Sequence, residues 1–314
     1  MPAAPRPRLR PPVTVMAAAA AASWPVGEGW LAEPKWDGWI AIAFRTPDGV
    51  YLQSRHGRDL SRYFPDVVAA AMRLPVGTVL DGELVAWAGH RTDFALLQRR
   101  VSRPGADPPV YLVCFYLLEH PGGVLVDEPL SVRRAALEQL LTAYPHPQLV
   151  ICPQATPAAA VDEWALWDQA GIEGVVFKPA AGSYRPGSRD WRKVRTMHPV
   201  DLVVGGVTGS LNRPGTLLLG EAVGHQFYFR GRTAPLAARD KEQLGELLPL
   251  LAGGGRPWPN PMPGRWVNLT AEQPLPYHGV EPVLVVEVDA DTAVDHGRYR
   301  HMLRLRRVRL DLLF

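Results

Sequence analysis

Lysine is scarce in this chain, which makes each lysine a possible reactive group. Only four of the 34 lysine and arginine residues are lysines, at positions 35, 178, 193 and 241. The first stands in Glu33-Pro34-Lys35-Trp36-Asp37-Gly38, where a carboxylate follows the amine by two residues and a glycine permits a tight backbone. A neutral lysine amine can form a covalent intermediate with an electrophile. An isolated segment of this kind more often marks a surface lysine entering a hairpin, so its meaning depends on the charged residues later in the chain.

Carboxylates occur at two later positions in a pattern that suits magnesium. Asp81-Gly82-Glu83 lies in a predicted strand, and Glu173-Gly174 begins another. Magnesium prefers oxygen ligands and bridges phosphates. The alternation of strand side chains places Asp81 and Glu83 on the same face. Positive charge, which a phosphoryl centre needs during displacement, would come from Lys178, Lys193 and Arg195.

The elements that position these side chains follow from the spacing of apolar and turn residues. Apolar runs at 39–45 and 50–55 flank Thr46-Pro47-Asp48-Gly49, which predicts a β-hairpin that begins just after Lys35. Further strands are predicted at 78–87, 110–118 and 174–178, and helices at 132–144 and 161–170. Gly171 is a plausible cap for the second of these helices.

The N-terminal segment imitates a secretory signal only loosely. Residues 13–22 include six consecutive alanines but lack leucine and phenylalanine. Cleavage after Ala22 would also leave Lys35 only about a dozen residues from the new end. We therefore predict a short helix packed on the first domain and a cytoplasmic protein. Cys114 and Cys152 lie in apolar surroundings and are predicted to be buried, reduced thiols.

Strands dominate the sequence beyond about residue 198. They are predicted at 200–207, 216–223, 226–232 and 283–288, with one helix at 240–251 and a Pro/Gly-rich loop at 253–264. This pattern fits a small closed barrel of the oligonucleotide-binding (OB) type, although strand count alone does not exclude other barrels. The predicted fold class is therefore α+β. A first domain of mixed and antiparallel sheets with helices spans 1–198, and an OB-fold β-barrel spans 199–314.

The overall composition agrees with a globular protein of two domains. The 314 residues are 47% hydrophobic and 21% charged, and no uninterrupted apolar stretch is long enough to span a membrane. A net charge of +3 does not by itself indicate a nucleic-acid partner. Residues 297–309, however, alternate arginine with apolar residues, as a strand with one basic face would. Such a face could bind phosphate or simply protect an edge strand from aggregation.

Taken in order, these motifs resemble those of the covalent nucleotidyltransferases, and within them the bacterial ATP-dependent DNA ligases of repair and end joining. The resemblance spans nearly the whole chain. Its most specific part is the pair of motifs at 173–178 and 183–195, which close the first domain. The other matches are Lys35-Trp36-Asp37-Gly38, Ser54-Arg55-His56-Gly57, Leu80-Asp81-Gly82-Glu83-Leu84, Phe115 at the adenine-stacking position, and the C-terminal segment 300–311.

The resemblance implies a nucleotidyltransferase (adenylation) domain followed by the barrel, with ATP and Mg²⁺ as cofactors. Lys35 would take AMP from ATP and pass it to a DNA 5′-phosphate, after which a 3′-hydroxyl would displace it. Nicked double-stranded DNA would be the partner, together with DNA repair proteins, and we expect a monomer. The implied site comprises the catalytic Lys35, the nucleotide-binding Glu33, Trp36, Asp37, Gly38, Arg55, Glu83, Phe115, Lys193, Arg195 and Arg309, and the metal-binding Asp81, Glu83 and Glu173.

Three positions depart from the family pattern. Ile40 stands where arginine is usual, Tyr116 where aspartate commonly follows the stacking aromatic, and Arg195 where lysine is usual. Because isoleucine offers no hydrogen bond to a phosphate, self-adenylation could survive while end joining weakens. The alternatives are a catalytically weakened nick-binding or repair-scaffold protein, an RNA ligase and a capping-type guanylyltransferase. An NAD-dependent ligase is disfavoured, since two cysteines cannot form its zinc module.

Overall fold

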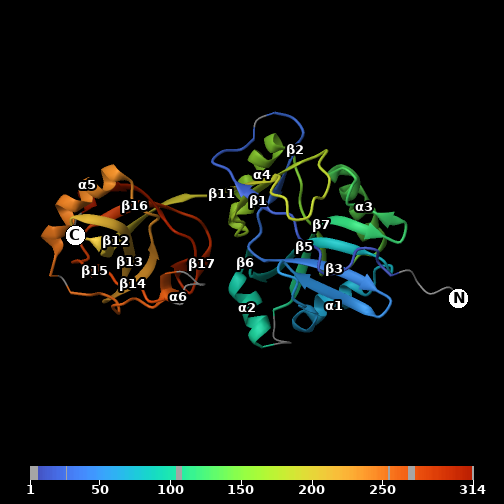
Figure 1. The fold of residues 1–314 in the computed structure, drawn as a ribbon, viewed down its shortest axis with the longest axis horizontal. Coiled ribbons are helices and arrows are strands. Elements are labelled where there is room, and N and C mark those ends of the chain that lie inside the picture. Colours follow the sequence, from blue (N-terminus) through green and yellow to red (C-terminus); the bar gives the residue numbers. More distant parts are fainter. Residues whose placement is uncertain (1–5, 26, 104–107, 254, 268–272, 313–314) are drawn as a thin grey trace. The chain divides into compact units, whose positions relative to one another are not determined.

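The chain forms two compact units, Met1–Thr196 and Met197–Phe314 (Figure 1). The computed structural model describes residues 6–25, 27–103, 108–253, 255–267 and 273–312. The division after Thr196 lies close to the boundary expected at 198. Across the described ranges, no helix is both long and apolar enough to cross a membrane.

The larger sheet of the first unit carries the hairpin that follows Lys35. Its strands run in the order β4-β3-β5-β7-β8, with β6 paired to β5 and β9 to β7. Because β3 pairs with β5, Ile40 and Glu83 lie directly opposite each other. The bounds are β3 (Trp39–Thr46), β4 (Gly49–Ser54), β5 (Val79–Ala88), β6 (Arg91–Thr92), β7 (Val110–His120), β8 (Gly123–Val124) and β9 (Leu149–Ile151).

The smaller sheet brings together the two segments that carry most of the predicted charged site. Its order is β1-β11-β10-β2, with β1 at Ala18–Ala20, β2 at Trp30–Pro34, β10 at Gly174–Pro179 and β11 at Trp191–Arg195. β10 is antiparallel to both β2 and β11. Residues far apart in the sequence, such as Glu33 and Lys193, therefore both lie opposite Val176.

The prediction of a short helix within 13–22 is wrong, because this segment is extended. Ala18–Ala20 form β1, which pairs in parallel with β11. Upstream, the Gln53 side chain accepts a hydrogen bond from the Val13 backbone N–H at 2.7 Å and donates one to its carbonyl at 2.6 Å. These long-range bonds satisfy the backbone groups that a helix would have paired internally, so tertiary pairing overrides the helix preference of alanine.

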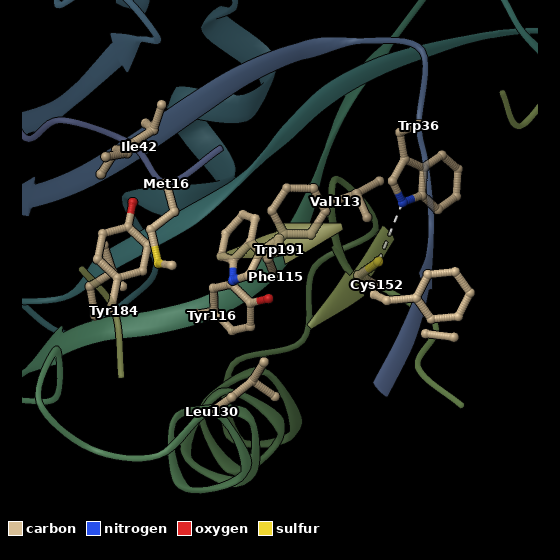
Figure 2. Packing of buried hydrophobic residues seen from close by; sticks show 14 of the residues in the cluster. Met16, Trp36, Ile42, Val113, Phe115, Tyr116, Leu130, Cys152, Tyr184 and Trp191 are labelled. Atoms are coloured by element: carbon tan, nitrogen blue, oxygen red, sulfur yellow. Dashed lines mark hydrogen bonds between the residues drawn. The ribbon is translucent and has the colours of Figure 1, made fainter. Parts of the chain in front are cut away.

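The main core of the first unit lies between its two sheets. Ile42 and Phe44 of β3 meet Val175 and Phe177 of β10 in one buried cluster. Figure 2 shows part of this cluster. The intervening Ala41 and Ala43 face the opposite side of β3, where a second apolar cluster includes residues of the helices. The larger sheet is therefore covered on both faces.

Helices supply the outer layer on that second face. The cluster there unites Val67 of α1, Leu97 of α2 and Leu137 of α3 with apolar residues of the sheet. The bounds are α1 (Pro65–Ala71), α2 (Phe94–Ser102), α3 (Leu130–Ala143) and α4 (Pro157–Gln169), with a 3₁₀ turn, η1, at Ser61–Tyr63. The predicted helices at 132–144 and 161–170 correspond to α3 and α4. Gly171, with φ of 78°, follows α4 in the left-handed conformation expected of a cap.

The second unit is built on a six-stranded antiparallel sheet with the order β14-β13-β12-β16-β19 and with β15 paired to β12. All four strands predicted between 200 and 288 are present. The bounds are β12 (His198–Ser210), β13 (Arg213–Val223), β14 (Gln226–Arg232), β15 (His278–Gly279), β16 (Val285–Ala290) and β19 (Arg304–Val308). The predicted helix at 240–251 is α5 (Ala238–Leu247) followed by the 3₁₀ turn η2 (Leu248–Leu251). Of the predicted loop at 253–264, residue 254 lies outside the described residues.

The prediction of a single basic strand over 297–309 is wrong. The segment divides into β18 (Arg298–Tyr299), which pairs with β17 (Val294–Asp295), and β19, which pairs with β16. The arginines of β19 face carboxylates of β16: Arg306 contacts Asp289 at 2.8 Å, and Arg307 contacts Glu287 at 2.8 Å. Opposite charges on neighbouring strands stabilise the pairing of those strands. The positive charge of these β19 arginines is therefore balanced by carboxylates within the second unit.

Two leucines in η2 give a direct test of the second unit's core. Leu248 is fully buried, whereas Leu250 is 80% exposed. Leu248→Ala should lower the free energy of unfolding of this unit by about 2–5 kcal/mol, because it leaves a cavity. Leu250→Ala should change it by about 0.5 kcal/mol or less. Urea unfolding of both variants measures the difference, and equal effects would contradict the packing described.

Candidate active site

The backbone of Lys35 is fixed against the start of β10. Its N–H donates to the Gly174 carbonyl at 2.8 Å, and its own carbonyl accepts from the Glu173 N–H at 2.9 Å. Nζ of Lys35 forms an ion pair with the Glu173 carboxylate, which is only 3% exposed, while the lysine side chain is 17% exposed. The amine is therefore held in a defined place but remains accessible.

A second carboxylate reaches the same loop from the larger sheet. The Gly38 N–H donates to Oε1 of Glu83 at 2.8 Å. A Cβ atom at position 38 would lie 2.2 Å from the Leu84 carbonyl oxygen, so only glycine allows the loop to approach β5 this closely. Burial raises the pKa of Glu83 to about 7, while Lys35 opposes this shift. The charge of Asp37 raises the pKa of Glu83 further, so the Asp37 carboxylate belongs to the same cluster.

Three further cations gather around Lys35, as the sequence predicts. Burial lowers the pKa of Lys193, and the charges of Lys35, Arg195 and Arg55 lower it further. Lys193 and Arg195 lie opposite Val176 and Gly174 of β10, respectively, whereas Arg55 immediately follows β4. Glu173 is a counter-ion of this group. Cations gathered around an accessible amine suit a polyanion such as a triphosphate.

Lys178 does not join this exposed cluster, contrary to the sequence prediction. Its side chain is only 2% exposed, and Nζ donates to a carboxylate oxygen of Glu33. Nζ also lies 4.4, 4.5 and 4.3 Å from the ring centroids of Phe115, Tyr116 and Trp191. Three aromatic faces and one carboxylate thus compensate for the loss of water around this ammonium group. The role of Lys178 is to hold Glu33 and Phe115 together.

Gln154 and Trp191 complete this buried group. Nε2 of Gln154 donates to Oε1 of Glu33 at 2.8 Å, and Trp191 supplies one of the three rings around Lys178. Figure 2 shows Phe115, Tyr116 and Trp191 grouped between Tyr184 and Cys152. Sequence reasoning gave Gln154 no role, because a lone glutamine between β9 and α4 carries no spacing signal.

Asp81 belongs to the buried group and not to the group around Lys35. It shares a face of β5 with Glu83, but it is 2% exposed. Burial raises its pKa to about 6, and its strongest opposing partner is Lys178, followed by Tyr184. The charges that act most strongly on Glu83 are instead Lys35 and Glu173. The predicted trio of Asp81, Glu83 and Glu173 is therefore divided between two environments.

Trp36 is a core residue at the edge of the site. It is 8% exposed, and its indole N–H donates to Sγ of Cys152 at 3.3 Å (Figure 2). Its ring also meets Trp87 edge-on, with centroids 6.1 Å apart. These contacts anchor the chain directly beside Lys35. Both Cys114 and Cys152 are buried free thiols, as predicted.

Arg309 lies in the second unit, within a set of carboxylates. Its guanidinium contacts Asp201 at 2.8 Å and Asp311 at 2.9 Å, with Glu287 at 3.7 Å. Hydrogen bonding to Asp311 raises the pKa of Arg309 further. In this arrangement the side chain ties the end of β19 to β12 and β16.

The carboxylates near Lys35 have the chemistry of a magnesium site that is completed by substrate. In the described part of the chain, no group of three or more His, Cys, Asp and Glu side chains is arranged to hold a metal ion by itself. Glu83 and Glu173 offer oxygen atoms beside the cationic cluster, and Mg²⁺ is commonly held by one or two carboxylates together with phosphate oxygens. The donor set therefore fits magnesium.

The ion pair between Lys178 and Glu33 can be tested by removing one or both of its charges. Lys178→Met should destabilise the first unit by about 3–5 kcal/mol, because it leaves the Glu33 carboxylate buried without its partner. Adding Glu33→Gln removes that charge and should recover at least half of the loss. Urea unfolding compares the variants, with Lys241→Met on α5 as the control for losing a lysine. No recovery in the double variant would contradict the pairing.

Comparison with known proteins agrees with this geometry. Residues 16–195 match the family model of the ATP dependent DNA ligase domain. The chain is 31% identical to DNA ligase C of Mycobacterium tuberculosis and 33% identical to DNA ligase C1 of Mycolicibacterium smegmatis, in each case over 96% of this chain and 91% of the relative. The solved ligase domain of M. tuberculosis LigD is 27% identical, with a TM-score of 0.53 and 96% of each chain covered. The chain belongs to the ATP-dependent DNA ligase family.

Proposed function

We propose that Lys35 is the nucleophile of this ligase and that the chain seals nicks in double-stranded DNA through a covalent lysyl-AMP intermediate. The observation that supports this most strongly is the setting of Lys35. Its backbone is fixed by hydrogen bonds to Gly174 and Glu173, and its amine is paired with the Glu173 carboxylate amid three further cations. Nζ forms a bond to the α-phosphorus of ATP, and pyrophosphate leaves. A DNA 5′-phosphate oxygen then attacks the same phosphorus and releases Lys35. Finally, the 3′-hydroxyl attacks the 5′-phosphorus and AMP leaves.

The side chains around Lys35 share the tasks of the first step, and Glu173 has two of them. The amine must be neutral when it attacks, and Glu173, already in contact with it, is the group placed to accept its proton. Lys193, Arg195 and Arg55 bind the phosphate oxygens, on which charge accumulates. Glu83 and Glu173 would hold Mg²⁺, which supplies charge neutralisation at the phosphates when bound. Asp37 adds a further carboxylate to this group. Gly38 allows the Lys35 loop to approach Glu83 closely.

The buried group around Lys178 provides the adenine-binding side of the site. Phe115 offers a ring on which a purine can stack, and the Glu33 carboxylate can accept a hydrogen bond from an amino group such as that of adenine. Lys178 and Gln154 orient Glu33 through hydrogen bonds. Asp81, which the sequence assigns to the metal, serves in this proposal to balance the buried charges of Lys178 and Arg133.

The second unit, from about residue 199, is proposed to be an OB-fold barrel that binds DNA. Two hydrogen bonds support closure of its sheet. The Ala234 N–H donates to the Leu303 carbonyl at 2.7 Å, and the Leu303 N–H donates to the Arg232 carbonyl at 2.9 Å. These bonds link the end of β14, at one edge of the sheet, to the residue that precedes β19 at the other edge. Arg309 would act on ATP only by leaving its carboxylate partners.

Nicked duplex DNA is the proposed substrate and DNA repair proteins are the proposed partners, with the chain acting as a monomer. A relative that is 30% identical over 86% of this chain is the multifunctional non-homologous end joining DNA repair protein LigD of M. tuberculosis. This similarity favours a role in break repair. The matching part is 35% of LigD, so the other activities of that protein are not inferred.

The assignment of Lys35 is tested by locating the AMP adduct. With ATP and magnesium, the protein should gain the mass of AMP on the peptide that contains Lys35, and Lys35→Ala should abolish the adduct. Lys241→Ala, on α5 of the second unit, should leave the adduct unchanged. An adduct mapped to Lys178, Lys193 or Lys241 in the wild type would overturn the assignment.

Ile40 provides a separate test of nick sealing. Because Ile40 lies opposite Glu83, an arginine there would place a guanidinium beside the proposed phosphate site. A charge-assisted hydrogen bond contributes about 1.5–3 kcal/mol, so Ile40→Arg should raise single-turnover sealing of a preadenylated nick by about tenfold or more. Ile40→Leu, which stays apolar, should not.

The wild type should correspondingly adenylate itself more completely than it seals nicks. Fast sealing by the wild type, with no gain from the arginine, would show that another residue already performs this role. The two variants should be compared at matched salt, because added positive charge alone strengthens binding to DNA.

A further inference from the structure

A hollow in the second unit combines cationic and aromatic side chains that the proposed reaction does not use. It has a volume of about 420 Å³ and lies between α6 (Gly264–Val267) and the β17–β18 hairpin. The basic and aromatic side chains that line it are Arg265, Trp266, His296, Arg298, Tyr299 and Arg300. Asp295, the acidic residue of the lining, contacts Nδ1 of His296 at 2.7 Å. The lining therefore carries a clear excess of positive charge.

Arg298 is held in place on the face of Trp266. Its guanidinium carbon lies 4.2 Å from the indole centroid. The indole is itself stacked on Phe229, with centroids 6.5 Å apart and planes 23° apart. A guanidinium that stacks on a ring directs its N–H donors sideways in its own plane. The aromatic wall thus orients Arg298 as a hydrogen-bond donor before any ligand binds.

The hairpin that presents Arg298 has a tight and well-supported turn. His296 and Gly297 have φ values of 48° and 75°, so both lie in the left-handed region that two-residue hairpin turns require. Nη1 of Arg230, from β14, donates to the Gly297 carbonyl at 2.8 Å. A non-glycine residue in this conformation is strained and needs such support. The turn therefore fixes the start of β18 relative to the sheet.

Arginines in and directly after β19 differ from Arg298 in their contacts. Arg306, Arg307 and Arg309 each contact carboxylates of their own unit at 2.8–2.9 Å. Arg298 instead lies over an aromatic ring. Asp295, the one carboxylate of the lining, is opposite Arg298 across the β17–β18 pair and contacts His296. A guanidinium group placed over an aromatic ring, in a lining where arginines outnumber carboxylates, is suited to a phosphate, which accepts several hydrogen bonds at once.

We propose that this hollow binds a backbone phosphate of the DNA substrate, with Arg265 and Arg298 as its donors and Trp266 as a positioning residue. The proposal rests on the proposed function, because it takes duplex DNA as the ligand. The site anchors the DNA strand to the second unit and takes no part in the attack by Lys35. Its recognition is independent of base sequence, since phosphate contacts position a duplex without reading it.

Binding of adenylated protein to nicked duplex tests this proposal. The duplex should lack the 3′-hydroxyl so that no sealing occurs, and affinity should be measured over a range of salt concentrations. Arg265→Ala and Arg298→Ala should each weaken binding by about tenfold, as expected for the loss of a charge-assisted contact. Each should also reduce the slope of log affinity against log salt by about 0.9, the value for one phosphate contact. Arg239 is an exposed arginine on α5, and Arg239→Ala is the charge-matched control. It should change the affinity and the salt dependence far less.

Self-adenylation separates failure of this inference from failure of the proposed function. If the wild type forms no AMP adduct, the proposed function itself fails. If the adduct forms normally but Arg265→Ala and Arg298→Ala bind nicked DNA as the Arg239→Ala control does, the hollow is not a DNA phosphate site. The proposal would also be overturned if these variants only raised the KM for ATP in self-adenylation, because the hollow would then bind the triphosphate. Thermal unfolding of each variant checks that the second unit remains folded.

Discussion

The pairing of β2 with β10 is the constraint on which the rest of the site depends. It ends in two backbone hydrogen bonds that join Lys35 to Gly174 and Glu173. A reactive lysine on a free loop would sample many positions, whereas this backbone is fixed at both its N–H and its carbonyl. The same two bonds determine where the Glu173 carboxylate lies, so the amine and its acidic partner are positioned by one interaction. Chemistry that depends on distance requires this kind of preorganisation.

Glycines allow the strands around Lys35 to approach closely enough to deliver the remaining charges. A Cβ atom at position 174 would lie 2.2 Å from the Val194 carbonyl oxygen, and one at position 82 would lie 2.4 Å from the Val113 carbonyl oxygen. The first approach brings β11, with Lys193 and Arg195, against β10. The second brings β7, with Phe115, against β5. Side chains at either position would separate the cationic or the aromatic part of the site from its carboxylates.

The sequence predicted the elements of the site better than the environments of its side chains. Motif order identified Lys35, Glu83 and Glu173, because each stands at a strand end or in a strand with a clear apolar pattern. It did not separate Asp81 from Glu83, since alternation places both on one face and says nothing of how deep each lies. Nor did it predict that Lys178 is enclosed, because the three rings around it come from strands that meet only in the folded chain. The extended segment at 13–20 was missed for the same reason: its pairing partners lie at residues 53 and 191–193.

Two of the three departures from the family pattern, at positions 116 and 40, differ in their structural consequences. Tyr116 is completely buried, and its ring contributes to the enclosure of Lys178, while its hydroxyl donates to Glu33 at 3.5 Å. An aspartate at that position would add a third carboxylate to a group that already holds Glu33 and Asp81. Tyrosine avoids this extra negative charge, and its ring and hydroxyl contact Lys178 and Glu33. Ile40 is only partly buried and packs against the core, and its apolar side chain cannot supply the positive charge of an arginine. Under the proposed function, the change at position 40 therefore affects phosphate binding, whereas the change at position 116 affects how Glu33 is held.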